Sequence, residues 1–332
     1  MKKRLLAIAL STIGAVGAVQ AGAVAQSSLQ ILNLNLLSGT AADGSGGTVL
    51  DASQFSFLQI SDATNLNATV TPGGATPFTA STAGGVALPY TQVCFPVACP
   101  AGLTAPGLFG NATTPATSNG ALAASSLNGA PITGLPAPVV ALTGANARTN
   151  AVAERTTTGA ANTTSALTVA TQFQFVPLTN LAITIRFSAI DHLLAYLDTQ
   201  TNAIAGSTWS ANITNHDTGA TVFDWVPNGS LAAGGITGGV EHLDPCSLTR
   251  TLTAFGPTAN ATYNCGSALP GGAAAFSATS NVLLAGIRYD FAINHQNQAN
   301  VSVLAVPEPS MLSLLGLALA GIAFTTRRKS KA

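Results

Sequence analysis

Four cysteines, Cys94, Cys99, Cys246 and Cys265, carry the most reactive side chains of the chain. Their spacings, C-x4-C and C-x18-C, do not match a zinc-binding pattern. An even number of cysteines predicts two disulfides if the chain folds in an oxidising compartment. Four cysteines allow three pairings. Proximity in the sequence favours Cys94 with Cys99 and Cys246 with Cys265.

The histidines are the next candidates for chemistry, because each lies close to a carboxylate in the sequence. The groups are Asp191-His192, His216-Asp217, Glu241-His242 with Asp244, and Asp290 with His295. Adjacent residues of a strand point to opposite faces, so neighbours in sequence need not act together. The chain has no H-x-x-x-H, H-E-x-x-H or G-x-S-x-G motif. We therefore predict no catalytic residue, no cofactor and no metal centre, and expect that the protein is not an enzyme.

Two alternatives remain for binding. Glu241, Asp244 and nearby loop carbonyls could supply the oxygen ligands that calcium requires, although no EF-hand pattern supports this. Trp209 and Trp225 could form a platform on which sugars stack. Both tryptophans follow the apolar positions of alternating segments, so we expect them in the core.

The charge distribution excludes one class of partner. Charged residues make up only 7% of the chain. Seven of the basic residues lie at the two ends, and residues 26–305 between them have five arginines, no lysine and eleven acidic residues, a formal charge of −6. Nucleic-acid binding requires clustered basic residues. We therefore expect no nucleic-acid partner.

Alternation of apolar and polar residues predicts an all-β body, and many short antiparallel strands favour a β-sandwich or a jelly roll. The alternating segments are 31–37, 55–60, 167–175, 181–187, 209–213, 221–226, 287–293 and 301–303. Polar turn residues at 215–219 join two of them. Residues 190–197 also show helical spacing, which allows a short helix or a continued strand.

A different composition marks residues 101–165, which are rich in Ala, Gly, Thr, Asn and Pro. Such a segment buries little apolar area, so we predict a low-complexity loop or insertion within a body that spans residues 26–305. A short strand at 138–142 is compatible with this. A second interpretation makes residues 26–100 a separate half of the sheet pair.

The N-terminus has the three parts of an export signal. Lys2, Lys3 and Arg4 are followed by the apolar residues 5–19 and by Ala23-Val24-Ala25. This pattern predicts a signal helix, a signal peptide over residues 1–25, and cleavage between Ala25 and Gln26. The alternative is an N-terminal membrane anchor.

The C-terminus also has three parts in order. They are the motif Pro307, Glu308, Pro309 within residues 306–310, the apolar residues 311–326, and the basic tail Arg327, Arg328, Lys329. The prolines impose an extended backbone before the predicted apolar helix, and the basic tail should remain cytoplasmic. A plain single-span anchor is the alternative.

These last 27 residues, 306–332, resemble the PEP-CTERM sorting signal. The resemblance, together with the signal peptide, implies an exosortase substrate: export, an inner-membrane intermediate, processing near the motif, and delivery to the cell surface or extracellular matrix of a bacterium. It also implies an exosortase-like enzyme as partner, with exopolysaccharide or other surface proteins as further partners.

For the body we expect a structural or interaction role at the surface. The first alternative is a carbohydrate-binding or adhesion module, and the second is an exported hydrolase.

Overall fold

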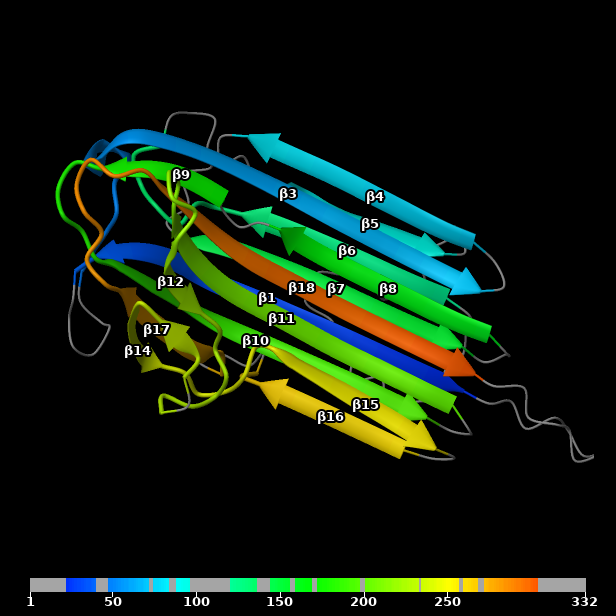
Figure 1. Ribbon diagram of the computed structural model, residues 1–332. Coiled ribbons are helices and arrows are strands. Elements are labelled where there is room, and N and C mark those ends of the chain that lie inside the picture. The colour runs from blue at the N-terminus through cyan, green and yellow to red at the C-terminus, as the bar shows by residue number, and fades with distance from the viewer. Residues whose placement is uncertain are drawn as a thin grey trace, which may run out of the picture.

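The computed structural model describes residues 22–39, 47–71, 74–83, 88–95, 120–135, 144–155, 159–168, 172–197, 201–232, 234–256, 259–267 and 272–303. Within these ranges the fold is all-β, as predicted, and consists of two stacked antiparallel sheets (Figure 1). The predicted apolar C-terminal helix lies outside the described residues, as does most of the predicted signal helix.

The first sheet has nine strands among the described residues, in the order β14-β17-β10-β1-β7-β6-β5, with β16 beside β10 and β2 beside β1. Its strands are β1 (Ala23–Ser38), β2 (Thr48–Val49), β5 (Leu88–Phe95), β6 (Gly120–Asn128), β7 (Ala145–Arg155), β10 (Ile183–Leu197), β14 (Gly239–Leu243), β16 (Ala259–Cys265) and β17 (Ala274–Ser280).

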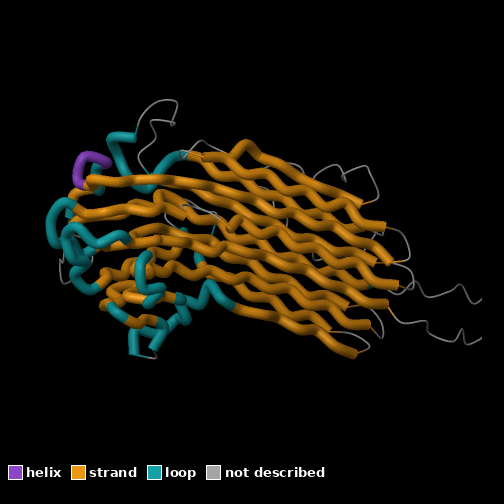
Figure 2. Tube along the Cα trace, turned by 45° about the horizontal axis from the view of Figure 1, so that its top comes forward, coloured by secondary structure: helices purple, strands orange, loops and turns teal. Residues whose placement is uncertain are grey.

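The second sheet, again counted over the described ranges, also has nine strands, in the order β13-β12-β11-β18-β8-β3-β4, with β15 beside β11 and β9 between β18 and β3. Its strands are β3 (Phe55–Thr71), β4 (Gly74–Ala83), β8 (Gly159–Thr168), β9 (Gln172–Pro177), β11 (Thr201–Asn215), β12 (Thr221–Trp225), β13 (Ile236–Thr237), β15 (Arg250–Gly256) and β18 (Tyr289–Val303). A short 3-10 helix, η2 (Ala52–Gln54), lies at the end of the sandwich opposite the start of β1 (Figure 2).

Side-chain alternation decides which face of each strand enters the sandwich. In β18 every second residue, from Tyr289 to Val303, is buried, and the residues between them are partly or fully exposed.

The turn at Asn215 follows the prediction as well. The Asn215 side chain accepts hydrogen bonds from the backbone N–H groups of Asp217 and Thr218, and Gly219 adopts a φ of 69°.

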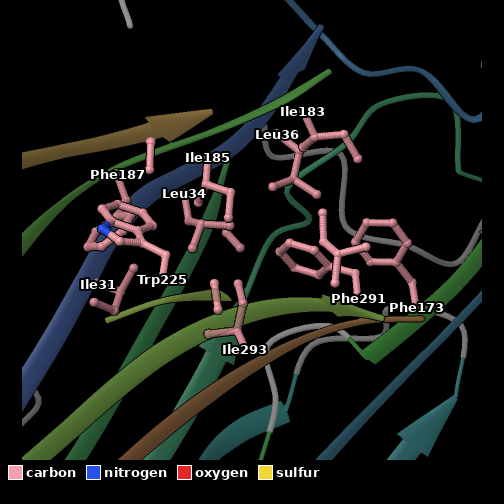
Figure 3. Packing of buried hydrophobic residues seen from close by; sticks show 14 of the residues in the cluster. Ile31, Leu34, Leu36, Phe173, Ile183, Ile185, Phe187, Trp225, Phe291 and Ile293 are labelled. Carbon is pink, nitrogen blue, oxygen red and sulfur yellow. The ribbon is translucent and has the colours of Figure 1, made fainter. Parts of the chain in front are cut away.

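Large aromatic side chains fill one half of the space between the sheets. The Phe187 ring lies 4.5 Å from Trp209 and 5.1 Å from Phe276, measured between centroids. Phe173 and Phe291 pack 4.8 Å apart farther along the core (Figure 3). Both tryptophans are fully buried, so their predicted place in the core is confirmed.

Small residues fill the other half. Its buried cluster consists largely of alanines, among them Ala25, Ala123, Ala151 and Ala205. Several strands of this half correct the prediction that residues 101–165 form a low-complexity loop or insertion, because β6, β7 and most of β8 lie in that range. Alanine has a low intrinsic strand propensity, but it fits the narrow space between two paired sheets. The short strand predicted at 138–142 lies outside the described residues.

Two alternatives left open by the sequence are decided by the structure. Residues 190–197 continue strand β10, which is one of the two possibilities for this segment, and form no helix. Residues 26–100 are not a separate half, because β1 belongs to the first sheet and β3 to the second.

A polar layer separates the aromatic and alanine-rich clusters at one level across the sandwich. On β18, His295 and Asn297 lie between Ile293 of the aromatic cluster and Ala299 of the alanine-rich cluster. On neighbouring strands, too, buried polar residues lie between a residue of the aromatic cluster and a residue of the alanine-rich cluster. The buried polar residues at this level include Ser27 on β1, Ser125 on β6, Thr149 on β7, Asp191 on β10, Ser207 on β11, and Asp62 and Thr64 on β3.

Candidate functional site

Uncharged polar side chains cover the outer face of the second sheet. Because the inward positions of β3, β11 and β18 are buried, their alternate residues face solvent. These are mainly amides and hydroxyls: Gln59, Ser61, Asn65, Asn67, Thr69 and Thr71 on β3, Thr208, Ser210, Asn212 and Thr214 on β11, and Asn294, Gln296, Gln298, Asn300 and Ser302 on β18. We call this surface the amide face.

A hollow of about 380 Å³ interrupts the amide face near the start of β18. It is lined by Gln59, Ser61, Phe173, Gln174, Asn212, Thr214, Asp290, Phe291 and Ala292. The strand register explains this grouping, since Gln59 pairs with Gln174, Gln174 with Asp290, and Asp290 with Thr214. Four strands therefore contribute one residue each to a single row.

Charged groups stand beside the hollow. Asp290 Oδ2 lies 2.8 Å from His216 Nδ1, and both side chains are about one-third exposed. Arg288 donates a hydrogen bond to the Gln174 side-chain oxygen. Its guanidinium also lies 4.4 Å from the centroid of the Phe57 ring. The arginine thereby links a half-exposed aromatic residue to the lining of the hollow.

This lining can hold a polar ligand. Amide side chains both donate and accept hydrogen bonds, as sugar hydroxyls do. Serine and threonine add hydroxyl partners, and Asp290 adds an acceptor. Within the described residues there is no group of three or more His, Cys, Asp or Glu side chains placed to hold a metal ion.

The residues considered for calcium have structural partners. Asp244 Oδ2 accepts hydrogen bonds from the backbone N–H groups of Asn228, Gly229 and Ser230, at 2.7 to 3.1 Å. Glu241 accepts a hydrogen bond of 2.5 Å from Trp225 Nε1, and burial raises the pKa of its carboxyl group. The structure thus uses both carboxylates to hold a loop and a core tryptophan.

The histidines separate from the acids beside them in the sequence. Asp191 points into the core, whereas His192 contacts Asn264 on the outer surface at 2.6 Å. Asp290 belongs to the amide face and His295 to the polar layer. His242 Nε2 lies 2.9 Å from the Thr279 hydroxyl. The contact between His216 and Asp290 joins residues 74 positions apart, which no local sequence pattern could indicate.

Cys246 and Cys265 form a disulfide with a Cα–Cα distance of 5.9 Å. It ties the end of β16 to the loop that precedes β15. Cys94 is also disulfide-bonded, and Cys99, which the sequence favours as its partner, lies outside the described residues.

Comparison with family models adds one observation: residues 305–329 match the PEP-CTERM protein-sorting motif. The chain carries a PEP-CTERM sorting motif. The match includes Pro307, Glu308, Pro309, the apolar run and the basic residues Arg327, Arg328 and Lys329. PEP-CTERM motifs mark exported proteins that an exosortase processes, by way of a membrane-associated intermediate, for the cell surface. This confirms the resemblance on which the sorting prediction rested.

The PEP-CTERM motif itself lies outside the described residues, and within them no helix is long and apolar enough to cross a membrane. No curated protein and no solved structure matches the chain. At the other end, Ala23 and Ala25 are buried in β1, where they pair with Leu197 and Ala195. Cleavage after Ala25 stays a prediction, and it would remove three residues from this strand.

Proposed function

We propose that the β-rich body is an interaction module of the cell surface or extracellular matrix, and that it binds neutral polysaccharide in the hollow of the amide face. The observation that carries the proposal is the lining of this hollow, where amides and hydroxyls from three strands and the Asp290 carboxylate from a fourth converge above two buried phenylalanines. Its volume falls in the range of small-molecule sites, about 300–1,000 Å³. A short stretch of a sugar chain would fit.

The charge of the body favours a neutral ligand over an anionic one. Its formal charge of −6 repels acidic polymers, and Asp290 lies in the lining itself. The PEP-CTERM motif supports the setting, because it directs the chain to a surface where such polymers occur.

The test is a binding titration of the mature protein with a soluble neutral glucan and with an acidic polyuronate. We expect binding of the glucan and little binding of the polyuronate. Replacing Gln59 and Asn212 together by alanine removes two polar groups from the lining. At roughly 0.5–1.5 kcal/mol per hydrogen bond, the loss of two should weaken affinity by roughly 5- to 150-fold.

Asn67→Ala is the matched control. Asn67 lies on the same strand and the same face as Gln59 and is likewise exposed, but it does not line the hollow. The Asn67→Ala variant should bind the glucan with the same affinity as the parent protein. Failure of the parent to bind the glucan, preference for the polyuronate, or an equal loss in the control would each contradict the proposal.

A further inference from the structure

Three side chains of the polar layer bring a nucleophile, a base and an amide together between the two sheets. The Thr149 hydroxyl oxygen lies 2.6 Å from His295 Nε2 and contacts the side-chain oxygen of Asn297. Thr149 belongs to β7 of the first sheet, and the other two belong to β18 of the second. Each of the three is no more than 1% exposed.

Asn297 is held from both sides. Its oxygen meets Thr149, and its nitrogen donates to the Ser27 hydroxyl, which in turn donates to the Gly206 carbonyl at 2.7 Å. The amide carbon is one bond away from the oxygen that Thr149 contacts. The hydroxyl is thereby held beside the amide group, and groups held close together react faster than the same groups free in water.

We propose that Thr149 and Asn297 become joined by an ester bond that links β7 to β18 across the sandwich. The Thr149 hydroxyl has a single proton, which can be directed at Asn297 or at His295 Nε2. When it is directed at His295, a lone pair of the hydroxyl oxygen is free to attack the Asn297 amide carbon. His295 then serves as the adjacent base that activates a hydroxyl nucleophile.

The reaction balances without any further reactant. The Thr149 oxygen forms a bond to the Asn297 carbonyl carbon, and the bond from that carbon to the amide nitrogen breaks. The hydroxyl proton passes by way of His295 Nε2 to the departing nitrogen. The products are one ester and one molecule of ammonia. Ammonia is protonated once it reaches water, which opposes the reverse reaction.

The surroundings suit both the reaction and the survival of its product. Burial lowers the pKa of His295 to about 3, against a weaker opposing effect of the Leu29 backbone, so the ring is neutral and Nε2 passes the proton on to the departing nitrogen rather than holding it. The apolar clusters on either side exclude the water that would otherwise hydrolyse the ester.

The test begins with the intact mass of the mature protein exported by its own bacterium. We expect a mass lower than that of the disulfide-bonded sequence by one ammonia. Proteolysis should release a branched peptide that joins the segments around Thr149 and Asn297, and hydroxylamine should separate its two arms. A parent protein of full mass without this branched peptide would overturn the proposal, and the three residues would then form a hydrogen-bond network only.

Variants separate this reaction from other losses of ammonia, such as succinimide formation at an asparagine elsewhere. Thr149→Val should abolish the branched peptide, whereas Thr149→Ser retains a hydroxyl and should still form it. Thr64→Val is the control, since Thr64 also makes a buried contact between the sheets, at 2.6 Å, but with the hydroxyl of Ser125, which has no carbonyl carbon to attack. It should leave the branched peptide in place. Persistence of the mass deficit in Thr149→Val would refute the assignment.

Discussion

Replacing Asp191 by asparagine should change how the stability of the fold depends on pH. Asp191 is fully buried in the polar layer, where one carboxylate oxygen accepts a hydrogen bond of 2.6 Å from Ser207. Burial raises the pKa of this carboxyl group from 3.8 to about 7, although hydrogen bonds from Ser207 and the His192 backbone oppose the shift. The folded state therefore holds a proton that the unfolded chain releases.

The sign follows from this difference. Because the pKa is raised in the folded state, the contribution of Asp191 is complete below pH 4 and is lost as the pH rises to 7. At about 1.4 kcal/mol per pKa unit, this loss amounts to about 4 kcal/mol. The asparagine side chain of the variant cannot titrate. The free energy of unfolding of Asp191→Asn minus that of the parent should thus be about 4 kcal/mol larger at pH 8 than at pH 4, which means that the variant gains stability relative to the parent as the pH rises.

His295 acts in the opposite direction. Burial depresses its pKa from 6.5 to about 3, so its contribution is present above pH 6.5 and declines as the pH falls. Between pH 8 and pH 4 this amounts to about 3 kcal/mol. In the parent protein, the loss of stability with rising pH that Asp191 causes and the gain that His295 causes nearly cancel. In Asp191→Asn the free energy of unfolding should therefore rise with pH, as His295 dictates. In His295→Gln it should fall with pH, as Asp191 dictates.

Urea unfolding followed by tryptophan fluorescence measures these differences, because Trp209 and Trp225 are both fully buried. Each variant is compared with the parent at several values between pH 4 and pH 8. Comparison at equal pH cancels the contribution of the other carboxylates. If Asp191→Asn and the parent show parallel curves, then Asp191 is hydrated or charged in the fold, and the reasoning fails.

Three further predictions concern the ends of the chain and the disulfide. Alanine at residues 307–309 should leave export and folding intact but trap the protein in the inner membrane, as fractionation and mass measurement would show; surface delivery of a trimmed variant would make the motif incidental. Replacing Cys246 and Cys265 by serine should cost roughly 3 kcal/mol in the free energy of unfolding, measured with urea, and an unchanged midpoint would contradict this. N-terminal sequencing of exported protein should begin at Gln26, whereas an intact Met1 would exclude cleavage after Ala25.

Alternation in the sequence was enough to predict the strands that carry large apolar residues. Ile185, Phe187, Ile213 and Phe291 all lie in the core of strands expected from their spacing. The strands near the alanine-rich cluster were missed because alanine, serine and asparagine do not distinguish a buried face from a wet one. In β7, residues on both faces are buried although few are bulky.

The candidate site could not be predicted for a related reason. Gln59, Asn212 and Asp290 look in the sequence like ordinary solvent-facing residues of three separate strands. Only the pairing of β3, β9, β18 and β11 places Gln59 and Asp290 in one row and brings Asn212 beside it. Conversely, His295 and Asn297 resemble surface residues in composition, yet strict alternation with Asp290 and Asn294 places them inside.

The position of β18 has a mechanical consequence. It is the last described strand before the sorting motif, and it lies inside the second sheet, with β11 on one side and β8 and β9 on the other. Its hydrogen bonds to β11 extend over its whole length, from Tyr289 to Val303. Tension applied to the chain beyond Val303 acts along the axis of this strand, so the bonds on both flanks are loaded in shear and must yield together. A strand at the edge, pulled across its axis, would instead release its bonds one after another.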